Sequence, residues 1–210
     1  MLYLSFIILC IVLIAAINCI FSVSAGGWDV PFVILTVCLS VVAVILIDSI
    51  FAFVARWILP KKLVSADNIR FAAGKKRRIF YEKIGIKKWK DLVPELGHLT
   101  GFRKNKIADP TNNEYVQRFI EEANCGVWGH SFGMIFGFLL AFFEFAYPWY
   151  FIRIGLWVAL VNAFINFLSY AILRYNLSKL HTLKRINEKR QKKKETEALL
   201  HAEVAATEQM

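Results

Sequence analysis

Residues 2–23, LYLSFIILCIVLIAAINCIFSV, carry no charged side chain over 22 positions. An α-helix needs about 20 consecutive apolar residues to cross the hydrocarbon core of a bilayer. Backbone amides find no water in that core, so a segment that crosses it is expected to be helical. This stretch therefore predicts a membrane-spanning helix and indicates an integral membrane protein.

Three further blocks extend this prediction along the chain: residues 31–59, 130–147 and 149–173. Each contains only one or two charged side chains. With 57% apolar residues and a mean hydropathy of +0.48, the 210-residue chain fits one membrane domain and not a soluble globule. We therefore expect an all-α integral membrane protein with four transmembrane helices arranged as two hairpins.

Lysine and arginine are concentrated in two segments of the chain. Residues 60–124 contain 15 Lys/Arg against eight Asp/Glu, and nine more Lys/Arg follow from Arg174 onward. Positive segments stay in the cytoplasm, so we expect a multi-pass protein of the cell membrane with both termini inside. The predicted order is a transmembrane hairpin (1–59), a basic interfacial loop (60–128), a second hairpin (129–173) and a basic tail (174–210).

The loop and the tail have helical patterns of their own. Phe71–Ile86 predicts short amphipathic helices, and Asp109–Asn112 predicts a turn before a helix that continues into the third span. The tail, Lys179–Glu208, is expected to be a solvated helix or a disordered arm. Its basic residues should attract anionic lipid headgroups.

His130 lies where the loop's last helix enters the third span. A neutral imidazole can accept a proton from a hydroxyl nucleophile, which makes His130 a candidate general base. Glu122 lies about 80° round the helix from His130, so a contact between them would need a bend or a bridging water. The alternative is an interfacial histidine beside ordinary surface acids.

Polar residues recur at a spacing of four along the fourth span: they are Asn162, Asn166, Tyr170 and Arg174. Amides inside a membrane helix need partners. The stripe therefore either hydrogen-bonds to neighbouring helices or receives a sugar or a lipid headgroup. Asp48 is an intramembrane carboxylate, for which Arg56 or Asn162 is a candidate partner, and structural pairing and catalysis are both open.

Small residues share one face of the third span: Gly129, Gly133, Gly137 and Ala141. Such a stripe favours close helix packing, and the alternative is a groove for a lipid chain. The sequence has no P-loop, GxGxxG, GxSxG or HExxH pattern, and its four cysteines form no CxxC pair. We therefore expect no cofactor and no metal. A loop tethered between spans also argues against nucleic acid as a partner.

Residues 80–106, FYEKIGIKKWKDLVPELGHLTGFRKNK, interleave aromatic and basic side chains. This composition suits a surface that lies on the membrane and holds an anionic, partly apolar molecule. The alternative is a loop whose charge only sets the topology. Candidate binding residues in this block are Trp89, Lys90, Asp91 and Glu95.

Four motifs in order carry a resemblance to a known family: the block from Tyr81 to Gly97, Gly101-Phe102-x-Lys104, Glu122…Gly126…His130, and Arg174-Tyr175-Asn176 with Leu180. Over about residues 40–180 the chain resembles the glycosyl-4,4′-diaponeurosporenoate acyltransferase family of small bacterial membrane proteins. The resemblance implies transfer of a fatty acyl group to a sugar hydroxyl of a carotenoid glucoside-like glycolipid. The leading hypothesis takes this group from a cytosolic donor, either acyl-CoA or another acyl carrier.

In this hypothesis His130 is the base, Glu122 orients it, and the binding residues also include Asn162, Asn166, Arg174, Tyr175 and Asn176. The chain departs from the family pattern at Cys125, Val127 and Ser131, where an arginine, a glutamate and a tryptophan are usual. The missing glutamate favours an alternative, a non-catalytic lipid-binding or scaffold protein. The sequence leaves the oligomeric state open.

Overall fold

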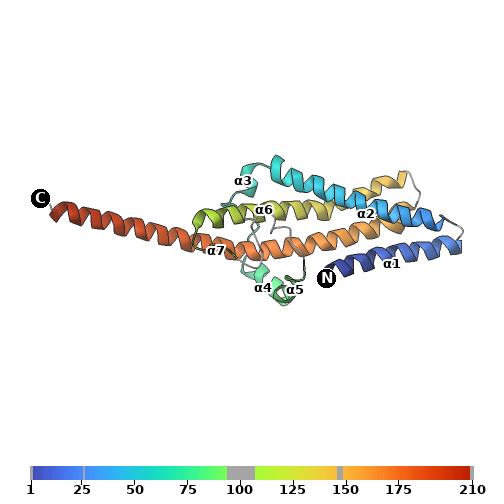
Figure 1. The fold of residues 1–210 in the computed structure, drawn as a ribbon, viewed down its shortest axis with the longest axis horizontal. Helices are drawn as coiled ribbons and strands as arrows, with labels where there is room; N and C mark the ends of the chain where they lie inside the picture. The colour runs from blue at the N-terminus through green and yellow to red at the C-terminus, as the bar shows by residue number, and fades with distance from the viewer. Residues whose placement is uncertain (1, 26, 94–106, 146–148, 209–210) are drawn as a thin grey trace.

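The computed structural model describes residues 2–25, 27–93, 107–145 and 149–208, and these residues form helices and no strand. Four helical segments are long and apolar enough to cross a membrane: Leu4–Ser24, Val30–Ile58, Asn113–Glu144 and Phe151–His201. They run alongside one another as two antiparallel hairpins (Figure 1). The prediction of an all-α membrane protein with four spans is confirmed.

The first hairpin consists of α1 (Leu2–Ala25) and α2 (Val30–Phe53). Proline occupies the first turn of α2, where its missing N–H removes no intrahelical hydrogen bond. α2 continues into the π-helical turn η1 (Val54–Ile58). The helix stops at Leu59, whose backbone is extended, because the following proline disfavours helical backbone in the residue before it.

Three short helices follow, as the amphipathic pattern of the loop predicts. They are α3 (Lys61–Val64), α4 (Lys75–Lys83) and α5 (Ile86–Trp89). Gly85 joins α4 to α5 with a φ of 72°, a left-handed conformation that glycine adopts without steric cost. In Figure 1, α3 lies above the bundle, and α4 and α5 project below it.

The helix α6 (Asn113–Phe136) begins at a hydrogen-bonded cap. Asn112 Oδ1 accepts from the backbone N–H of Tyr115 at 3.0 Å. Asp109 Oδ1 in turn accepts from the backbone N–H groups of Thr111 and Asn112. The predicted turn at residues 109–112 is thus confirmed. α6 runs without a break into the 3₁₀ segment η3 (Gly137–Phe145).

The last helical segment starts with the π-helical turn η4 (Phe151–Gly155) and continues as α7 (Leu156–Glu208), which has 53 residues. Glu144 caps its start, because its carboxylate accepts from the backbone N–H groups of Trp149 at 2.7 Å and Phe151 at 2.6 Å. Of the two conformations considered for the tail, the structure shows the helix. This helix extends far beyond the bundle (Figure 1).

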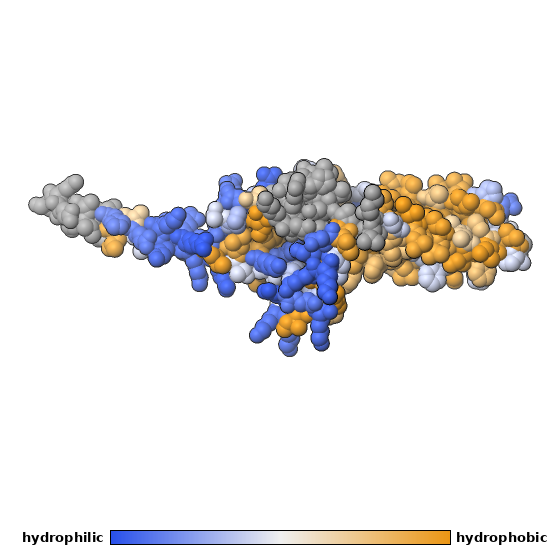
Figure 2. Space-filling view, turned by 60° about the horizontal axis from the view of Figure 1, so that its bottom comes forward, coloured by the Kyte–Doolittle hydropathy of each residue, from blue (hydrophilic) through white to orange (hydrophobic). Residues whose placement is uncertain are grey.

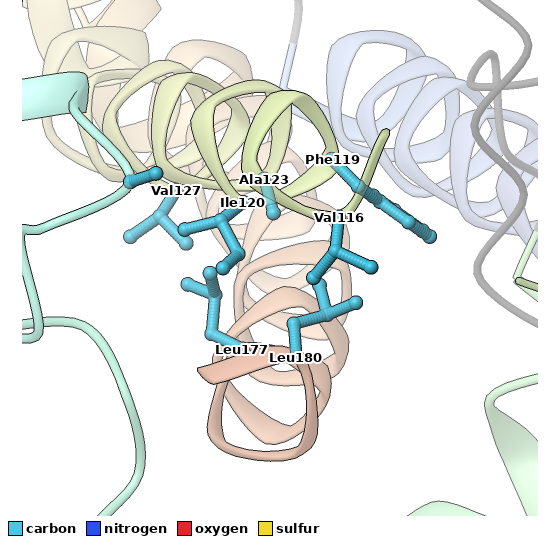
Figure 3. Close-up of a cluster of buried hydrophobic side chains, with 8 residues drawn as sticks. Val116, Phe119, Ile120, Ala123, Val127, Leu177 and Leu180 are labelled. Atoms are coloured by element: carbon cyan, nitrogen blue, oxygen red, sulfur yellow. The ribbon is translucent and has the colours of Figure 1, made fainter. Parts of the chain in front are cut away.

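The packing of α6 against α7 is the most extensive helix contact of the described residues. Figure 3 shows its apolar core, which also includes Ala66 and is formed by Val116, Phe119, Ile120, Ala123, Val127, Leu177 and Leu180. Each α6 residue in this core is at most 7% exposed. The α6 residues of this core all precede the predicted boundary at 128/129, and Leu177 and Leu180 follow the boundary at 173/174, so the core joins the predicted loop to the predicted tail.

The surface divides the molecule into two parts. Figure 2 shows apolar residues covering one half of the bundle, while hydrophilic residues gather where α4 and α5 project and along the extension of α7. This division fits helices that are embedded in lipid at one end and meet water at the other.

We expect Asn112→Ala to destabilise the protein by about 1 kcal/mol, because the first turn of α6 loses the acceptor for the N–H of Tyr115. Thermal unfolding of the detergent-solubilised protein measures this as a lower Tm. Asn112→Ser keeps an acceptor and is the control, with a Tm close to that of the wild type. Equal melting of Asn112→Ala and the wild type would contradict the role of the cap.

Candidate active site

Polar side chains from three helices meet inside the bundle. Asp48 of α2 accepts a hydrogen bond from Asn166 Nδ2 of α7 at 2.9 Å and another from Asn162 Nδ2 at 3.2 Å. On the other side of the same amide, Asn166 Oδ1 lies 2.8 Å from His130 Nδ1 of α6. These four residues, here called the polar network, join α2, α6 and α7.

The polar network fixes the tautomer of the histidine. The NH₂ group of Asn166 donates to Asp48, so the amide oxygen of Asn166 points away from this carboxyl group. The Oδ1 of Asn166 then faces His130 and only accepts, which places the imidazole proton on Nδ1. The other ring nitrogen, Nε2, keeps its lone pair. An imidazole in this arrangement has one nitrogen, Nε2, that can accept a proton.

The four residues of the polar network differ in how deeply they are buried. Asn162 and Asn166 are enclosed, at 8% and 6% exposure, whereas His130 and Asp48 are partly exposed. Asn162 also donates to the backbone carbonyl of Gly133, and Asn166 donates to the carbonyl of Asn162. The amides are thus held in place by several hydrogen bonds, and His130 keeps only part of its surface exposed beside them.

The glycine stripe of α6 provides the space for these amides. A Cβ atom on Gly133 would lie 2.7 Å from Asn166 Oδ1, and one on Gly137 would lie 2.8 Å from Asn162 Nδ2. Gly129 faces α2, with Ala52 Cα 3.8 Å from its ideal Cβ position. The interpretation of the stripe as a packing surface is therefore supported, with the asparagine side chains lying directly against two of its glycines.

Glu122 lies on the same side of α6 as the glycines but has a different partner from the one predicted. Its carboxylate accepts two hydrogen bonds from Arg56 of η1, at 2.6 and 3.2 Å. The group that hydrogen-bonds to His130 is Asn166. Of the two partners considered for Asp48, Asn162 binds it, while Arg56 binds Glu122. A helical wheel of α6 alone does not reveal these cross-helix choices.

The arginine–tyrosine pair of the fourth span lies among the loop helices. Arg174 is 9% exposed and donates to the backbone carbonyl of Phe71 at 3.1 Å and to Tyr170 Oη at 2.6 Å. Tyr175 is fully buried, and its hydroxyl donates to Glu82 Oε1 of α4 at 3.2 Å. Both residues therefore attach the loop to α7, about two to three turns away from Asn166 along the helix.

The remaining predicted binding residues lie near the same contacts. Trp89 donates from its indole N–H to the carbonyl of Ile84 at 3.0 Å and packs beside Tyr175. Lys90 is partly exposed, Asp91 is exposed, and Asn176 is partly exposed. Glu95 lies outside the described residues. The structure thus separates the predicted site into an intramembrane group around His130 and a group around Tyr175.

Asp48, for which structural pairing and catalysis were both open, is the acid that the structure connects to His130 through Asn166. It is the only acid of its span, and the spacing of Asn162 and Asn166 places two amides on one face of α7. Those two signals together could have connected Asp48 to His130 through Asn166. Among the described residues no group of three His, Cys, Asp or Glu side chains is arranged to hold a metal ion.

The sequence profile of glycosyl-4,4′-diaponeurosporenoate acyltransferases matches residues 55–186, which is more than half of the chain. The chain belongs to this family. Membership implies an acyltransferase that acts on a glycosyl carotenoid. The region shared with the acyltransferase family includes His130 and Asn166 and begins after Asp48. No curated protein and no solved structure matches the chain.

We expect Gly133→Ala to lower the stability of this acyltransferase family member by about 1–3 kcal/mol, because the new methyl group overlaps the amide of Asn166. The measurement is thermal unfolding in detergent. Gly74→Ala is the matched control, since nothing lies within 4 Å of its ideal Cβ position. A Gly133→Ala protein that melts with the wild type and keeps full activity would contradict the close packing of Asn166.

Proposed function

We propose that the protein is a membrane O-acyltransferase that moves a fatty acyl group from cytosolic acyl-CoA to a sugar hydroxyl of a carotenoid glucoside-like glycolipid. The observation that best supports this function is the hydrogen-bonded series Asp48–Asn166–His130, which presents a base inside the membrane-spanning bundle. Family membership supports the same reaction class.

In the proposed reaction His130 Nε2 removes the proton from the sugar hydroxyl. The sugar oxygen attacks the thioester carbonyl of the donor, and a tetrahedral intermediate forms. Its collapse breaks the carbon–sulfur bond, and the proton held by His130 passes to the departing thiolate. The products are the sugar ester and free coenzyme A thiol, so no oxidant, reductant or further co-reactant is needed.

Asp48 and Asn166 act in this proposal as positioning residues. The amide of Asn166 holds the imidazole in one orientation, and the charge of Asp48 favours the imidazolium that forms when His130 takes the proton. We assign Glu122 a different role from the one predicted by the sequence. Its ion pair with Arg56 joins α6 to η1 near the network.

The orientation of the chain follows the distribution of its charge. We propose that the basic loop and the C-terminal tail face the cytoplasm, because lysine and arginine are concentrated in them. The N-terminus, separated from the loop by one transmembrane hairpin, then lies on the same side. This orientation presents α4 and α5 to a water-soluble donor, while the glycolipid reaches His130 from within the membrane.

An apolar groove supports the alternative, a non-catalytic lipid-binding protein. The groove has a volume of about 810 Å³ and lies between α1 and α7, with Phe6, Phe21, Trp157 and Phe164 among its lining residues. Leu160 and Phe164 point about 200° away from Asn162 and Asn166 on α7. A lipid in this groove would therefore be separated from His130 by the width of the helix.

We expect His130→Ala to lower the rate of acyl transfer by about 10²- to 10⁴-fold, because the sugar hydroxyl loses its base. Native membranes containing either protein are supplied with labelled fatty acid, and lipid extracts are compared by mass spectrometry. Membrane insertion of both proteins is checked by their resistance to extraction at high pH. Undiminished formation of the acylated glycolipid by His130→Ala would contradict the proposed base and favour the lipid-binding alternative.

A second pair of variants identifies the carboxylate that supports His130. We expect Asp48→Asn to lower kcat about 10- to 100-fold and to shift the pH profile of kcat, because the imidazolium loses a nearby negative charge. Glu122→Gln is expected to change kcat only a few-fold, since its partner is Arg56. The opposite ranking of the two variants would restore Glu122 as the orienting residue.

A further inference from the structure

A second charged site lies outside the polar network, where α4, α5 and α7 meet. Glu82 Oε1 of α4 is the centre of its contacts. This oxygen accepts from Tyr175 Oη at 3.2 Å and lies 3.3 Å from Lys87 Nζ and 3.5 Å from Arg78 Nε. The hydrogen bond from Lys87 holds the pKa of Glu82 below its usual value, so this carboxylate is ionised near neutral pH.

Two further lysines complete the site. Lys179 Nζ lies 4.6 Å from the centre of the Tyr175 ring, in a cation–π arrangement. Lys90 follows Lys87 by three residues and, with Arg78 and Lys87, supplies positive charge in the immediate surroundings of Lys179. We call these four cations the α4–α7 basic cluster: Arg78, Lys87, Lys90 and Lys179.

The cluster has more positive charge than its own carboxylates neutralise. Residues 75–91 contain eight Lys/Arg against two acids, Glu82 and Asp91, before Lys179 of α7 is added. Lysines held near one another repel, and an anion with several charges relieves that repulsion. Figure 2 shows hydrophilic residues gathered where α4 and α5 project from the bundle.

The base of the cluster is rigid and apolar. Tyr175 and Ile86 are fully buried, and Trp89 packs against them together with Val93 and Ile172. The side chains that carry the charges therefore project from a packed core. Two sequence motifs that lie more than 80 residues apart, around Trp89 and Tyr175, meet at this point.

The spacing along α7 indicates the shape of the ligand. Lys179 follows Asn166 by 13 residues on one continuous helix, which corresponds to about 20 Å along the axis. In an acyl phosphate or a phospholipid, only a few bonds separate the phosphate from the acyl carbonyl. A donor that places its phosphates on the cluster and its carbonyl at His130 must have a long arm between them, as coenzyme A does.

We infer that the α4–α7 basic cluster binds the phosphates of a long-armed acyl thioester donor. The inference rests on the proposed function for the reaction and for its acyl-CoA donor, and it adds the residues that bind the phosphates of this donor. Binding energy comes from charge-assisted contacts of the phosphates with the α4–α7 basic cluster. The thioester carbonyl, at the other end of the donor, lies near His130.

The test uses the full-length protein in nanodiscs of neutral phosphatidylcholine and measures the Kd of coenzyme A by calorimetry. We expect Lys90→Glu combined with Lys179→Glu to weaken binding about 100-fold, roughly tenfold for each lost cation. Lys90→Gln with Lys179→Gln should give a smaller loss and guards against misfolding of the first variant. The matched control is Lys61→Glu with Lys62→Glu, which reverses two exposed charges on α3, across the bundle (Figure 1).

Anionic lipid headgroups carry the same phosphate chemistry and are tested separately. The donor assignment is supported if the Lys90→Glu, Lys179→Glu variant loses coenzyme A binding while the wild type and the variant bind phosphatidylglycerol equally well. If coenzyme A binds both proteins equally, the inference is overturned. It is also overturned if the cluster responds only to phosphatidylglycerol and not to coenzyme A.

Kinetics separate this inference from the proposed function. The cluster variant should raise the KM for the acyl donor and keep kcat, whereas His130→Ala should lose kcat and still bind coenzyme A. If the wild type binds coenzyme A but transfers no acyl group, the proposed function is overturned and the binding site still stands. If the wild type transfers acyl groups but does not bind coenzyme A, the binding site is overturned and the acyltransferase function still stands.

Discussion

A carboxylate inside a membrane-spanning bundle must be hydrogen-bonded, because an isolated charge there is strongly unfavourable. Asp48 meets this requirement with two amides of a different helix, Asn162 and Asn166. The rest of the bundle is arranged around this interaction. The amides need room, which Gly133 and Gly137 provide on α6, and the remaining oxygen of Asn166 binds His130.

The same interaction connects stability with chemistry. A hydrogen-bonded amide between an acid and an imidazole determines which nitrogen carries the proton, so packing of the three helices also selects the reactive tautomer. The ion pair of Arg56 and Glu122 lies about two turns away and fastens α2's π-helical end to α6. His130 is thus held through contacts among three helices, of which α2 begins before the region shared with the family.

The sequence predicted the elements that depend on local pattern. Four uninterrupted apolar blocks indicated four spans, and the Asp109–Asn112 turn indicated the start of α6 because capping depends on residues within one turn. The partners of Glu122 and Asp48 could not be assigned with the same certainty. They depend on how α2, α6 and α7 are rotated against one another, and this rotation is set by contacts such as Gly133 with Asn166 that no spacing reveals.

The group of predicted binding residues around Tyr175 shows a second limit of prediction from sequence. The sequence placed Trp89, Arg174 and Tyr175 among the binding residues, and the structure brings Trp89 and Tyr175 together but uses them largely for internal contacts. The charged side chains of the α4–α7 basic cluster project from the core that these contacts form. Residue type alone does not distinguish a side chain that holds a surface in place from one that forms it.

Because α7 is one continuous helix, it fixes the rotational orientation of two distant regions relative to each other. Asn166 and Lys179 belong to one helix of 53 residues, so their relative rotation is fixed by the number of residues between them. One inserted residue would turn the end of α7 that carries Lys179 by about 100° relative to Asp48 and His130, and would displace it by about 1.5 Å. The number of residues between Asn166 and Lys179 therefore fixes how these two regions are oriented relative to each other.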